Sequence, residues 1–343
     1  MTRKKNSRIF CSVEICAGAG GQALGLEAAG FSHAALVEND IHACQTLLLN
    51  RPQWNVIECD LRTFSGVPFH GIDLLAGGVP CPPFTVAGKQ LGAEDERDLF
   101  PEALRLTDEM NPKAVMLENV QGFAKEKFSA YRQKIIRFFE SRGFAAGWRV
   151  FNASDFGVPQ LRPRFILVAI KQEFANYFSW PEPQSKRVTV GESLHDLMAA
   201  NGWAGATSWR EKADNVAPTL VGGSKKHGGP DLGPTRAKRQ WGELGVDGHG
   251  LASDPPEASF PEGKMPRLTV RMAARIQGFP DNWQFSGKKT ASYRQVGNAF
   301  PPPVAKSVGL RIYAALKEVP LTPSERAQMG FFTFGQFAAS AQP

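Results

Sequence analysis

The fold class of this chain is decided by the stretch Glu14-Ile15-Cys16-Ala17-Gly18-Ala19-Gly20-Gly21. It follows an apolar run (residues 9–15) that predicts a strand, and it opens a run (residues 21–29) that predicts a helix. Gly18-x-Gly20-x-x-Ala23 fits the nucleotide-binding turn, in which glycines let the backbone approach a ligand at a helix N-terminus. A tight strand-to-helix turn without a ligand remains the alternative at this point.

Beyond this stretch, predicted strands and predicted helices alternate along the chain. Short apolar runs predict buried, mostly parallel strands at 34–37, 55–57, 74–76, 114–117 and 164–170. Amphipathic runs predict helices at 41–49, 99–110, 130–142 and 303–316. The fold class that follows is a Rossmann-like α/β domain with flanking helices. From about 185 to 265 the chain is rich in Gly, Pro, Asp and Lys, which predicts a small, loop-rich second unit.

Composition narrows the class of protein. Of 343 residues, 42% are hydrophobic, and no apolar run approaches the roughly 20 residues that a membrane span needs. Five scattered cysteines without a CxxC pair argue against disulfides and against a metal site, and indicate a reducing, intracellular setting. We therefore expect no membrane partner and no metal.

Charge is concentrated in two stretches. Residues 219–241 hold five basic side chains against one acidic one, and residues 264–294 hold seven against one. With a formal net charge of +7, these stretches are consistent with a phosphate-backbone footprint. Solvated loop charge is the equally simple alternative.

Acidic residues follow two of the expected strands. Glu38 ends the second strand and could accept hydrogen bonds from ribose hydroxyls, while Asp60 follows the third and could reach a nucleobase amine. Together with the glycine turn, they indicate an adenosine cofactor. NAD and S-adenosylmethionine both remain open on these residues.

Three further features could carry chemistry. Pro80-Cys81 ends an apolar run, where a thiol can serve as a nucleophile, although a lone Cys-Pro is more often a buried thiol. Glu118 ends another strand and could protonate a ring nitrogen while a thiolate attacks a neighbouring carbon. Arg162 and Arg164 enter a strand two residues apart and so face one side, where they could hold a carbonyl oxygen or a phosphate.

The order of these motifs is more specific than any one of them. It closely resembles that of the DNA (cytosine-5) methyltransferase family, in its single-chain bacterial restriction-modification form, from about residue 9 to residue 316 outside the variable stretch 183–266. The resemblance rests on Ala17-to-Gly21, Glu38, Pro80-Cys81, Glu118-Asn119-Val120, Gln160-x-Arg162-x-Arg164, Arg275-to-Pro280 and Gln295-to-Ala299.

The resemblance implies a mechanism. Cys81 would add to C6 of a flipped-out cytosine, Glu118 would protonate or hydrogen-bond N3, and Arg164 would hold O2 with Arg162 as its companion. C5 would then accept the methyl group of S-adenosyl-L-methionine. The loop 82–97, which contains Gln90, would close over the DNA.

It also implies a cofactor site. Glu38 would bind the ribose, Asp60 with Leu61 the adenine, and the turn Ala17, Gly18, Gly20 and Gly21 the methionine end. Pro80, Asn298 and Ala299 would complete the site, with the last helix packed beside the first. Three positions depart from the family pattern: Cys16 replaces a phenylalanine, Asn39 a bulkier apolar residue, and Pro82 a glutamine.

The implied organisation is a Rossmann-like S-adenosylmethionine-dependent domain (1–184 and 271–320), a target-recognition domain (185–270) and a C-terminal tail (321–343). The residues expected to contact DNA are Thr219, Leu220, Lys225, Lys226, Arg236, Lys238, Arg239 and Gln90. Arginine reads guanine best, but sequence cannot sort base contacts from phosphate contacts.

The expected function is methylation of duplex DNA, protecting host DNA beside a restriction endonuclease that is a functional rather than a physical partner. We expect a monomer in the prokaryotic cytoplasm. Three alternatives stay open. An RNA cytosine-5 methyltransferase would carry a Cys-Phe-Thr element that this chain lacks, and a catalytically inactive DNA-binding relative would have lost Cys81 or Glu118. An NAD-dependent dehydrogenase would explain only the glycine turn.

Overall fold

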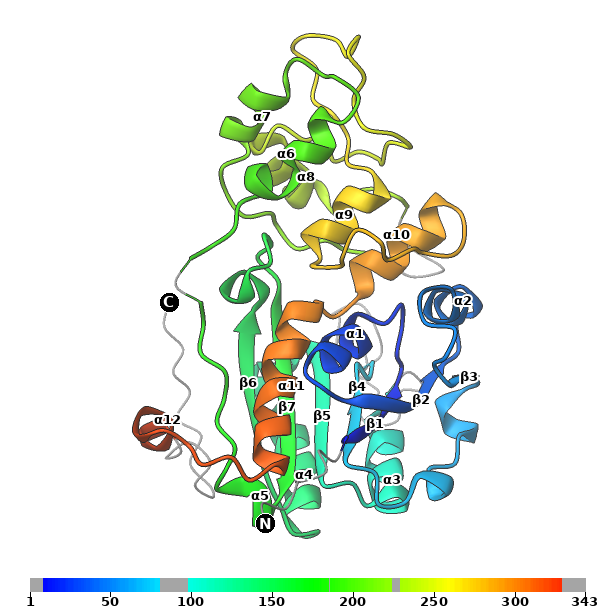
Figure 1. Ribbon diagram of the computed structural model, residues 1–343, viewed down its shortest axis with the longest axis vertical. Helices are drawn as coiled ribbons and strands as arrows, with labels where there is room; N and C mark the ends of the chain where they lie inside the picture. Colours follow the sequence, from blue (N-terminus) through cyan, green and yellow to red (C-terminus); the bar gives the residue numbers. More distant parts are fainter. Residues whose placement is uncertain (1–8, 81–97, 185, 224–228, 329–343) are drawn as a thin grey trace, which may run out of the picture.

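The computed structural model describes residues 9–80, 98–184, 186–223 and 229–328 (Figure 1). A sheet flanked by helices forms the lower lobe in Figure 1, and short helices with long connections form the upper lobe. The chain enters the upper lobe after β7 and returns through α10 to the long helix α11, which lies beside the sheet.

The sheet has seven strands in the order β3-β2-β1-β4-β5-β7-β6, and only β7 runs antiparallel to its neighbours. The mostly parallel α/β fold is therefore confirmed. Sequence reasoning missed β6. The strands are β1 (Cys11–Ile15), β2 (Ser32–Glu38), β3 (Val56–Glu58), β4 (Leu74–Gly77), β5 (Ala114–Val120), β6 (Phe144–Asn152) and β7 (Pro163–Lys171).

The helices of the lower lobe are α1 (Gly21–Ala28), α2 (Ile41–Asn50), α3 (Phe100–Met110), α4 (Ser129–Glu140), α5 (Gln172–Ala175), α11 (Pro302–Leu316) and α12 (Pro323–Gln328). Those of the upper lobe and its junction are α6 (Val190–Ala199), α7 (Ala206–Lys212), α8 (Thr235–Glu243), α9 (Val270–Ile276) and α10 (Lys289–Asn298). Short 3-10 turns connect several elements, among them η1 (Leu61–Thr63).

Each face of the sheet is covered by helices because the strands are apolar on both sides. Leu74 and Ala76 of β4 pack in a cluster with α1 and α11, whereas Leu75 points to the opposite face, toward α3 and α4. This alternation follows from the two-residue period of a strand. The result is a three-layer domain with two cores.

The first and last long helices pack closely, as the resemblance implied. Gly25 of α1 makes this possible, because a Cβ there would lie 2.5 Å from both the Cβ of Ala305 and the carbonyl oxygen of Pro302. A glycine inside a helix costs about 1 kcal/mol relative to alanine. Here that cost permits a helix contact that no larger residue allows.

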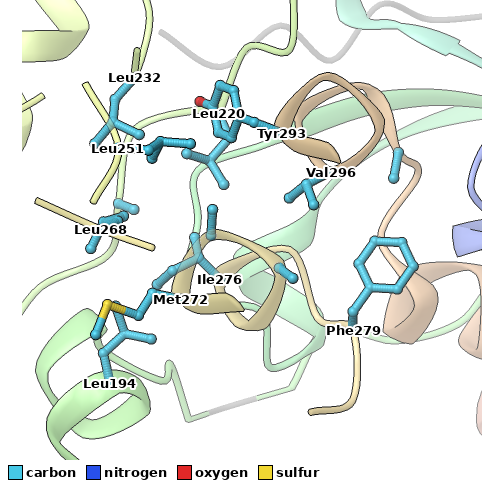
Figure 2. Close-up of a cluster of buried hydrophobic side chains, with 14 of the residues drawn as sticks. Leu194, Leu220, Leu232, Leu251, Leu268, Met272, Ile276, Phe279, Tyr293 and Val296 are labelled. Atoms are coloured by element: carbon cyan, nitrogen blue, oxygen red, sulfur yellow. The ribbon is translucent and has the colours of Figure 1, made fainter. Parts of the chain in front are cut away.

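The upper lobe has its own apolar core. Figure 2 shows Leu194, Met272 and Ile276 among the buried side chains that meet around α9. Sequence reasoning expected mainly loops here and missed α6, α7 and α8. One local signal exists, since Thr189 and Glu192 form a capping box at the start of α6. The domain boundary expected at residue 270 falls at the start of α9, and the apolar cluster continues across it.

Candidate active site

A cavity of about 330 Å³ lies at the carboxyl ends of β1, β2, β4 and β5. Cys16, Glu38, Pro80 and Glu118 line it from these strand ends, and α10 with Phe300 forms a facing wall. Ligands of open α/β sheets bind at this edge, and the volume lies within the range of small-molecule sites.

The turn between β1 and α1 forms one side of the cavity. Ala17, Gly18 and Gly21 line it, in agreement with the sequence prediction. Gly20 is not among the lining residues, and its role is conformational. Its φ of 85° favours glycine, and a Cβ there would come within 2.7 Å of the Leu47 side chain.

Trp283 supports this turn from a distant part of the chain. Its indole N–H donates to the carbonyl oxygen of Ala19 at 3.1 Å, and its ring would lie 3.0 Å from a Cβ at Gly20. The guanidinium of Arg51 lies 5.4 Å from the centre of the same ring. Sequence reasoning gave no role to Trp283, since nothing local connects it with Ala19, which lies 264 residues earlier in the chain.

Glu38 is fixed at the rim of the cavity by backbone amides. One carboxylate oxygen accepts from the N–H of Gly18 at 2.7 Å, and the other accepts from Asn39 and Asp40 at 2.8 Å each. The carboxylate therefore joins the glycine turn to the start of α2. Glu38 thus lies in the cavity wall, and its binding of a ribose stays a prediction.

The second predicted acid behaves differently. Asp60 caps η1, and its carboxylate pairs with Arg62 at 2.9 Å. Leu61, not Asp60, is among the residues that line the cavity. Pro80, Asn298 and Ala299 also line it, and the Asn298 carboxamide donates to the carbonyl of Gly223 at 3.1 Å.

Glu118 lines the cavity and is largely buried. Arg164 Nε lies 2.7 Å from the Glu118 carboxylate. Arg164 is on β7, where it lies opposite Val120 at the end of β5. Burial raises the pKa of Glu118, and the nearby charges of Arg164 and Arg162 oppose this. The net effect is a raised pKa, which favours the protonated form of Glu118 more than at an ordinary carboxyl group.

Arg162 has other partners. Fully buried, it donates to the carbonyl of Leu220 at 2.7 Å and to those of Gly297 and Ala299 at 2.8 and 3.0 Å. It does not line the cavity. Arg162, expected as the catalytic companion of Arg164, instead holds the backbone beside Asn298 with its guanidinium and is a positioning residue.

Two glutamines complete this network. Gln160 accepts from the N–H of Leu220 at 2.8 Å and donates to the side-chain oxygen of Gln277 at 2.6 Å. Gln277 in turn donates to the carbonyl of Ala299 at 2.5 Å. Three motifs far apart in sequence thus meet behind the cavity wall.

Four predicted site residues lie outside the described residues: Cys81, Gln90, Lys225 and Lys226. The backbone on either side of the segment 81–97 is fixed, since Leu99 N–H donates to the carbonyl of Pro80 at 3.2 Å. Asn119 also donates to the carbonyl of Val79 at 2.8 Å. Val79 therefore lies beside the end of β5, and Pro80 lies beside Leu99.

The remaining predicted DNA contacts divide into buried and exposed groups. Leu220 has only 1% of its surface exposed, so its side chain belongs to the core and cannot contact DNA, which corrects that prediction. Thr219 donates to the carbonyl of Leu161 at 2.5 Å. On α8, Arg236 and Arg239 are exposed, whereas Lys238 pairs with Asp231 at 2.8 Å.

Several lining residues were not predicted. Glu14, Gln22 and Arg294 all contribute to the cavity wall. Glu14 lies inside the stretch that identified the turn, and Gln22 follows its last glycine, so proximity to the motif was the available signal.

Among the described residues, no three His, Cys, Asp or Glu side chains come together as a group that could hold a metal ion. No helix in the described ranges is long and apolar enough to cross a membrane.

Comparison with known proteins gives consistent matches. A family model described as C-5 cytosine-specific DNA methylase matches residues 10–314. The chain is 58% identical to the Type II methyltransferase M.NaeI of Lentzea aerocolonigenes, over 89% of this chain and 75% of that protein. It is also 58% identical to the Type II methyltransferase M.NgoMIV of Neisseria gonorrhoeae, over 90% of this chain and 99% of that protein.

A solved structure resembles the whole fold. It belongs to a protein described as a DNA modification methyltransferase encoded within an Escherichia coli prophage. The TM-score is 0.63 at 25% identity, covering 90% of this chain and 99% of that one.

Proposed function

This chain belongs to the C-5 cytosine-specific DNA methylase family, and from that membership we propose which of its residues carry out the reaction. It is an S-adenosylmethionine-dependent DNA (cytosine-5) methyltransferase. The dehydrogenase alternative is thereby excluded. The assignments of individual residues that follow are our proposal.

The reaction must overcome the weak nucleophilicity of C5. In our proposal the Cys81 thiolate adds to C6, and Glu118 gives a proton or a hydrogen bond to N3, so that C5 becomes enamine-like. S-adenosylmethionine, when bound, supplies the methyl group. Loss of the C5 proton and elimination of the thiol then release the product and regenerate Cys81.

One observation carries this assignment: the chain just before Cys81 lies against Glu118. A Cβ at Gly78 would come within 3.1 Å of the Glu118 carboxylate, and Pro80 and Glu118 line the same cavity. The backbone that leads to the thiol is therefore next to the proposed proton donor. Arg164, paired with Glu118, is in place to hold O2 of the same base.

The cavity fits the cofactor. Of its described lining residues, four carry carboxyl groups (Glu14, Glu38, Asp40 and Glu118) and one, Arg294, is cationic. That excess of acidic groups suits a ligand with a net positive charge such as S-adenosylmethionine. We propose that Glu38 and Leu61 hold the nucleoside, and that Ala17, Gly18, Gly21, Pro80, Asn298 and Ala299 enclose the rest.

For DNA we propose that the segment 185–270 recognises the target and that 1–184 with 271–320 catalyses the reaction. Exposed Arg236 and Arg239 on α8 support this, and Lys225 and Lys226 belong to the same basic stretch. The tail, 321–343, has no assigned role.

The biological role we propose is protection of host DNA in a restriction-modification system, because the two relatives are named Type II methyltransferases. The endonuclease would act on the same site without needing to bind this chain. We further propose that the protein acts as a monomer in the cytoplasm of a prokaryotic cell, where its DNA substrate lies.

The test is methyl transfer from labelled S-adenosylmethionine by the purified chain, followed by bisulfite sequencing of DNA from cells that express it. We expect protected cytosines at one recurrent short site, and none with Cys81→Ser, which should still bind the cofactor. Transfer to RNA but not to duplex DNA would favour the RNA alternative, and no transfer would favour an inactive relative.

Covalent trapping tests the nucleophile directly. DNA with 5-fluorocytosine at the target cannot lose a C5 proton, so the adduct should persist through denaturation with the native chain. If Cys81→Ser still formed this adduct, another residue would have to be the nucleophile.

A further inference from the structure

The backbone just before Cys81 is held by a residue that lies beyond the segment 81–97. Leu99 donates its N–H to the carbonyl of Pro80 at 3.2 Å, and both residues line the cavity. The position of the backbone at Pro80 therefore depends on the position of Leu99. Whatever holds Leu99 in place also fixes the point from which the chain continues to Cys81.

Asp98, the neighbour of Leu99, is a buried carboxylate that accepts hydrogen bonds from two elements. It is 8% exposed. One oxygen accepts from the N–H of Phe100 at 3.0 Å, at the start of α3, and the other accepts from the hydroxyl of Tyr131 on α4 at 2.5 Å. Because a buried carboxylate is costly unless its oxygens are hydrogen-bonded, these two donors fix its position. Asp98 thus joins the start of α3 to α4.

The ring of Tyr131 is itself held by two buried aromatic side chains. Its centre lies 6.1 Å from that of Phe100 and 6.0 Å from that of Phe123, both in edge-to-face geometry. Phe100 and Phe123 stack on each other with their ring centres 5.0 Å apart. Aromatic rings packed in this way have few alternative orientations. The Tyr131 hydroxyl is therefore a fixed donor for Asp98.

The next residue of α4, Arg132, holds the chain on the other side of the reactive end. Its guanidinium donates to the carbonyl of Phe123 at 2.6 Å and to that of Lys125 at 2.7 Å. These carbonyls belong to the stretch that follows β5, the strand that carries Glu118. The first turn of α4 thus contacts both the chain that follows Glu118 and, through Asp98, the chain beside Pro80.

We propose that Tyr131 and Asp98 are positioning residues for methyl transfer. Their hydrogen bond fixes Leu99, and Leu99 in turn fixes the backbone at Pro80, the residue before the nucleophile. Neither side chain is among the described residues that line the cavity, so neither has to touch DNA or the cofactor. A misplacement of about 1 Å at a reacting group can lower a rate by about 100-fold. The inference rests on the proposed function, in which Cys81 attacks C6.

Tyr131→Phe in the full chain removes the hydroxyl and keeps the ring. The substrate is DNA that carries the site found by bisulfite sequencing. We expect the single-turnover rate of methylation, and the rate of adduct formation with the 5-fluorocytosine form of that DNA, to fall together by about 10- to 100-fold. The affinities for S-adenosylmethionine and for DNA should stay within about twofold of native, and the pH dependence of the rate should keep its shape, because Glu118 is unchanged.

Two further variants show whether the hydrogen bond itself is responsible. Tyr313→Phe is the matched control, because its ring packs in the core on the opposite face of the sheet and its hydroxyl has no hydrogen bond in the described parts of the chain; its rates should be native. Asp98→Asn has one acceptor oxygen in place of two and should slow both reactions as Tyr131→Phe does. Because both changes remove the same hydrogen bond, the double variant should lose little more than the slower single one.

Several results would overturn the inference. Native rates in Tyr131→Phe would remove its assigned role, and rate losses that multiply in the double variant would show that Tyr131 and Asp98 do not act as a pair. An equal loss of rate in Tyr313→Phe, or a loss of affinity that accounts for the loss of rate, would point to general damage to the fold. Failure of the native chain to form the adduct would instead contradict the proposed function.

Discussion

The two ends of the cavity are built in opposite ways. At the reactive end, Glu118 is already paired with Arg164 at 2.7 Å, so its position is set before any ligand arrives. At the start of α1, Glu14 and Gln22 keep unpartnered polar atoms. Paired groups preorganise chemistry, whereas unpaired buried groups destabilise the empty protein and favour the bound one. We therefore expect cofactor binding to raise the melting temperature.

The largest effect should come from substituting Glu118, the paired carboxyl group at the reactive end of the cavity. Because burial raises the pKa of Glu118, its protonated form is available as a donor, and the rate should fall as pH rises through that raised pKa. Glu118→Gln should lower the single-turnover rate by about 10²- to 10⁴-fold and remove this alkaline decline. Measuring rate against pH checks both; a decline that persists in the variant would belong to another group.

Substitutions of Arg162 and Arg164 should differ in their effects on the free energy of unfolding and on the reaction rate. Arg162→Met leaves the buried carbonyls of Leu220 and Gly297 without this donor and that of Ala299 with Gln277 alone, and should lower the free energy of unfolding by about 3–5 kcal/mol. Arg164→Met should cost less stability and more rate, because it removes the partner of Glu118. Urea denaturation and single-turnover kinetics on both variants decide this. A larger loss of rate in Arg162→Met and a larger loss of stability in Arg164→Met would contradict these assignments.

A smaller effect should appear at the glycine turn. Trp283→Phe keeps the ring but loses the N–H that donates to Ala19, so KM for the cofactor should rise about 3- to 10-fold with kcat nearly unchanged. Trp241→Phe is the matched control, because its indole nitrogen has no partner among the described residues. An equal rise in KM for both variants would point to general loosening of the upper lobe.

The smallest effect should appear on α8, where a paired basic side chain again lies beside an unpaired one. Lys238 is paired with Asp231, whereas Arg239 is exposed and has no ion-pair partner in the described parts of the chain. Arg239→Ala should reduce the slope of log affinity for DNA against log salt by about 0.9, and Lys238→Ala by less. Equal slopes in all three proteins would place this face away from DNA.

The sequence predicted those parts of the molecule whose structure is determined by residues close together in the chain. The strands, the glycine turn and Glu38 followed from short-range patterns, because a two-residue alternation and a turn conformation are properties of neighbouring residues. β6 was missed because Gly147 and two alanines weaken its pattern. The short helices of the upper lobe depend mainly on packing around α9.

Roles that depend on distant partners could not be read from sequence. Arg162 and Arg164 look equivalent two residues apart, yet one holds backbone carbonyls from two distant segments and the other holds Glu118. Leu220 belongs to a motif that suggested DNA, and only its burial places it in the core. Trp283 acts on a turn at the other end of the chain.

The close contact between α1 and α11 has a consequence for synthesis. A ribosome makes residues 21–28 long before residues 302–316, and the two helices approach closely at Gly25 and Ala305 on one face of the sheet. Until α11 has emerged, the apolar surface of α1 and the neighbouring strands has no cover. We expect the nascent chain to be a chaperone substrate until residues 302–316 have been made, and the sheet lobe to close only as α11 docks.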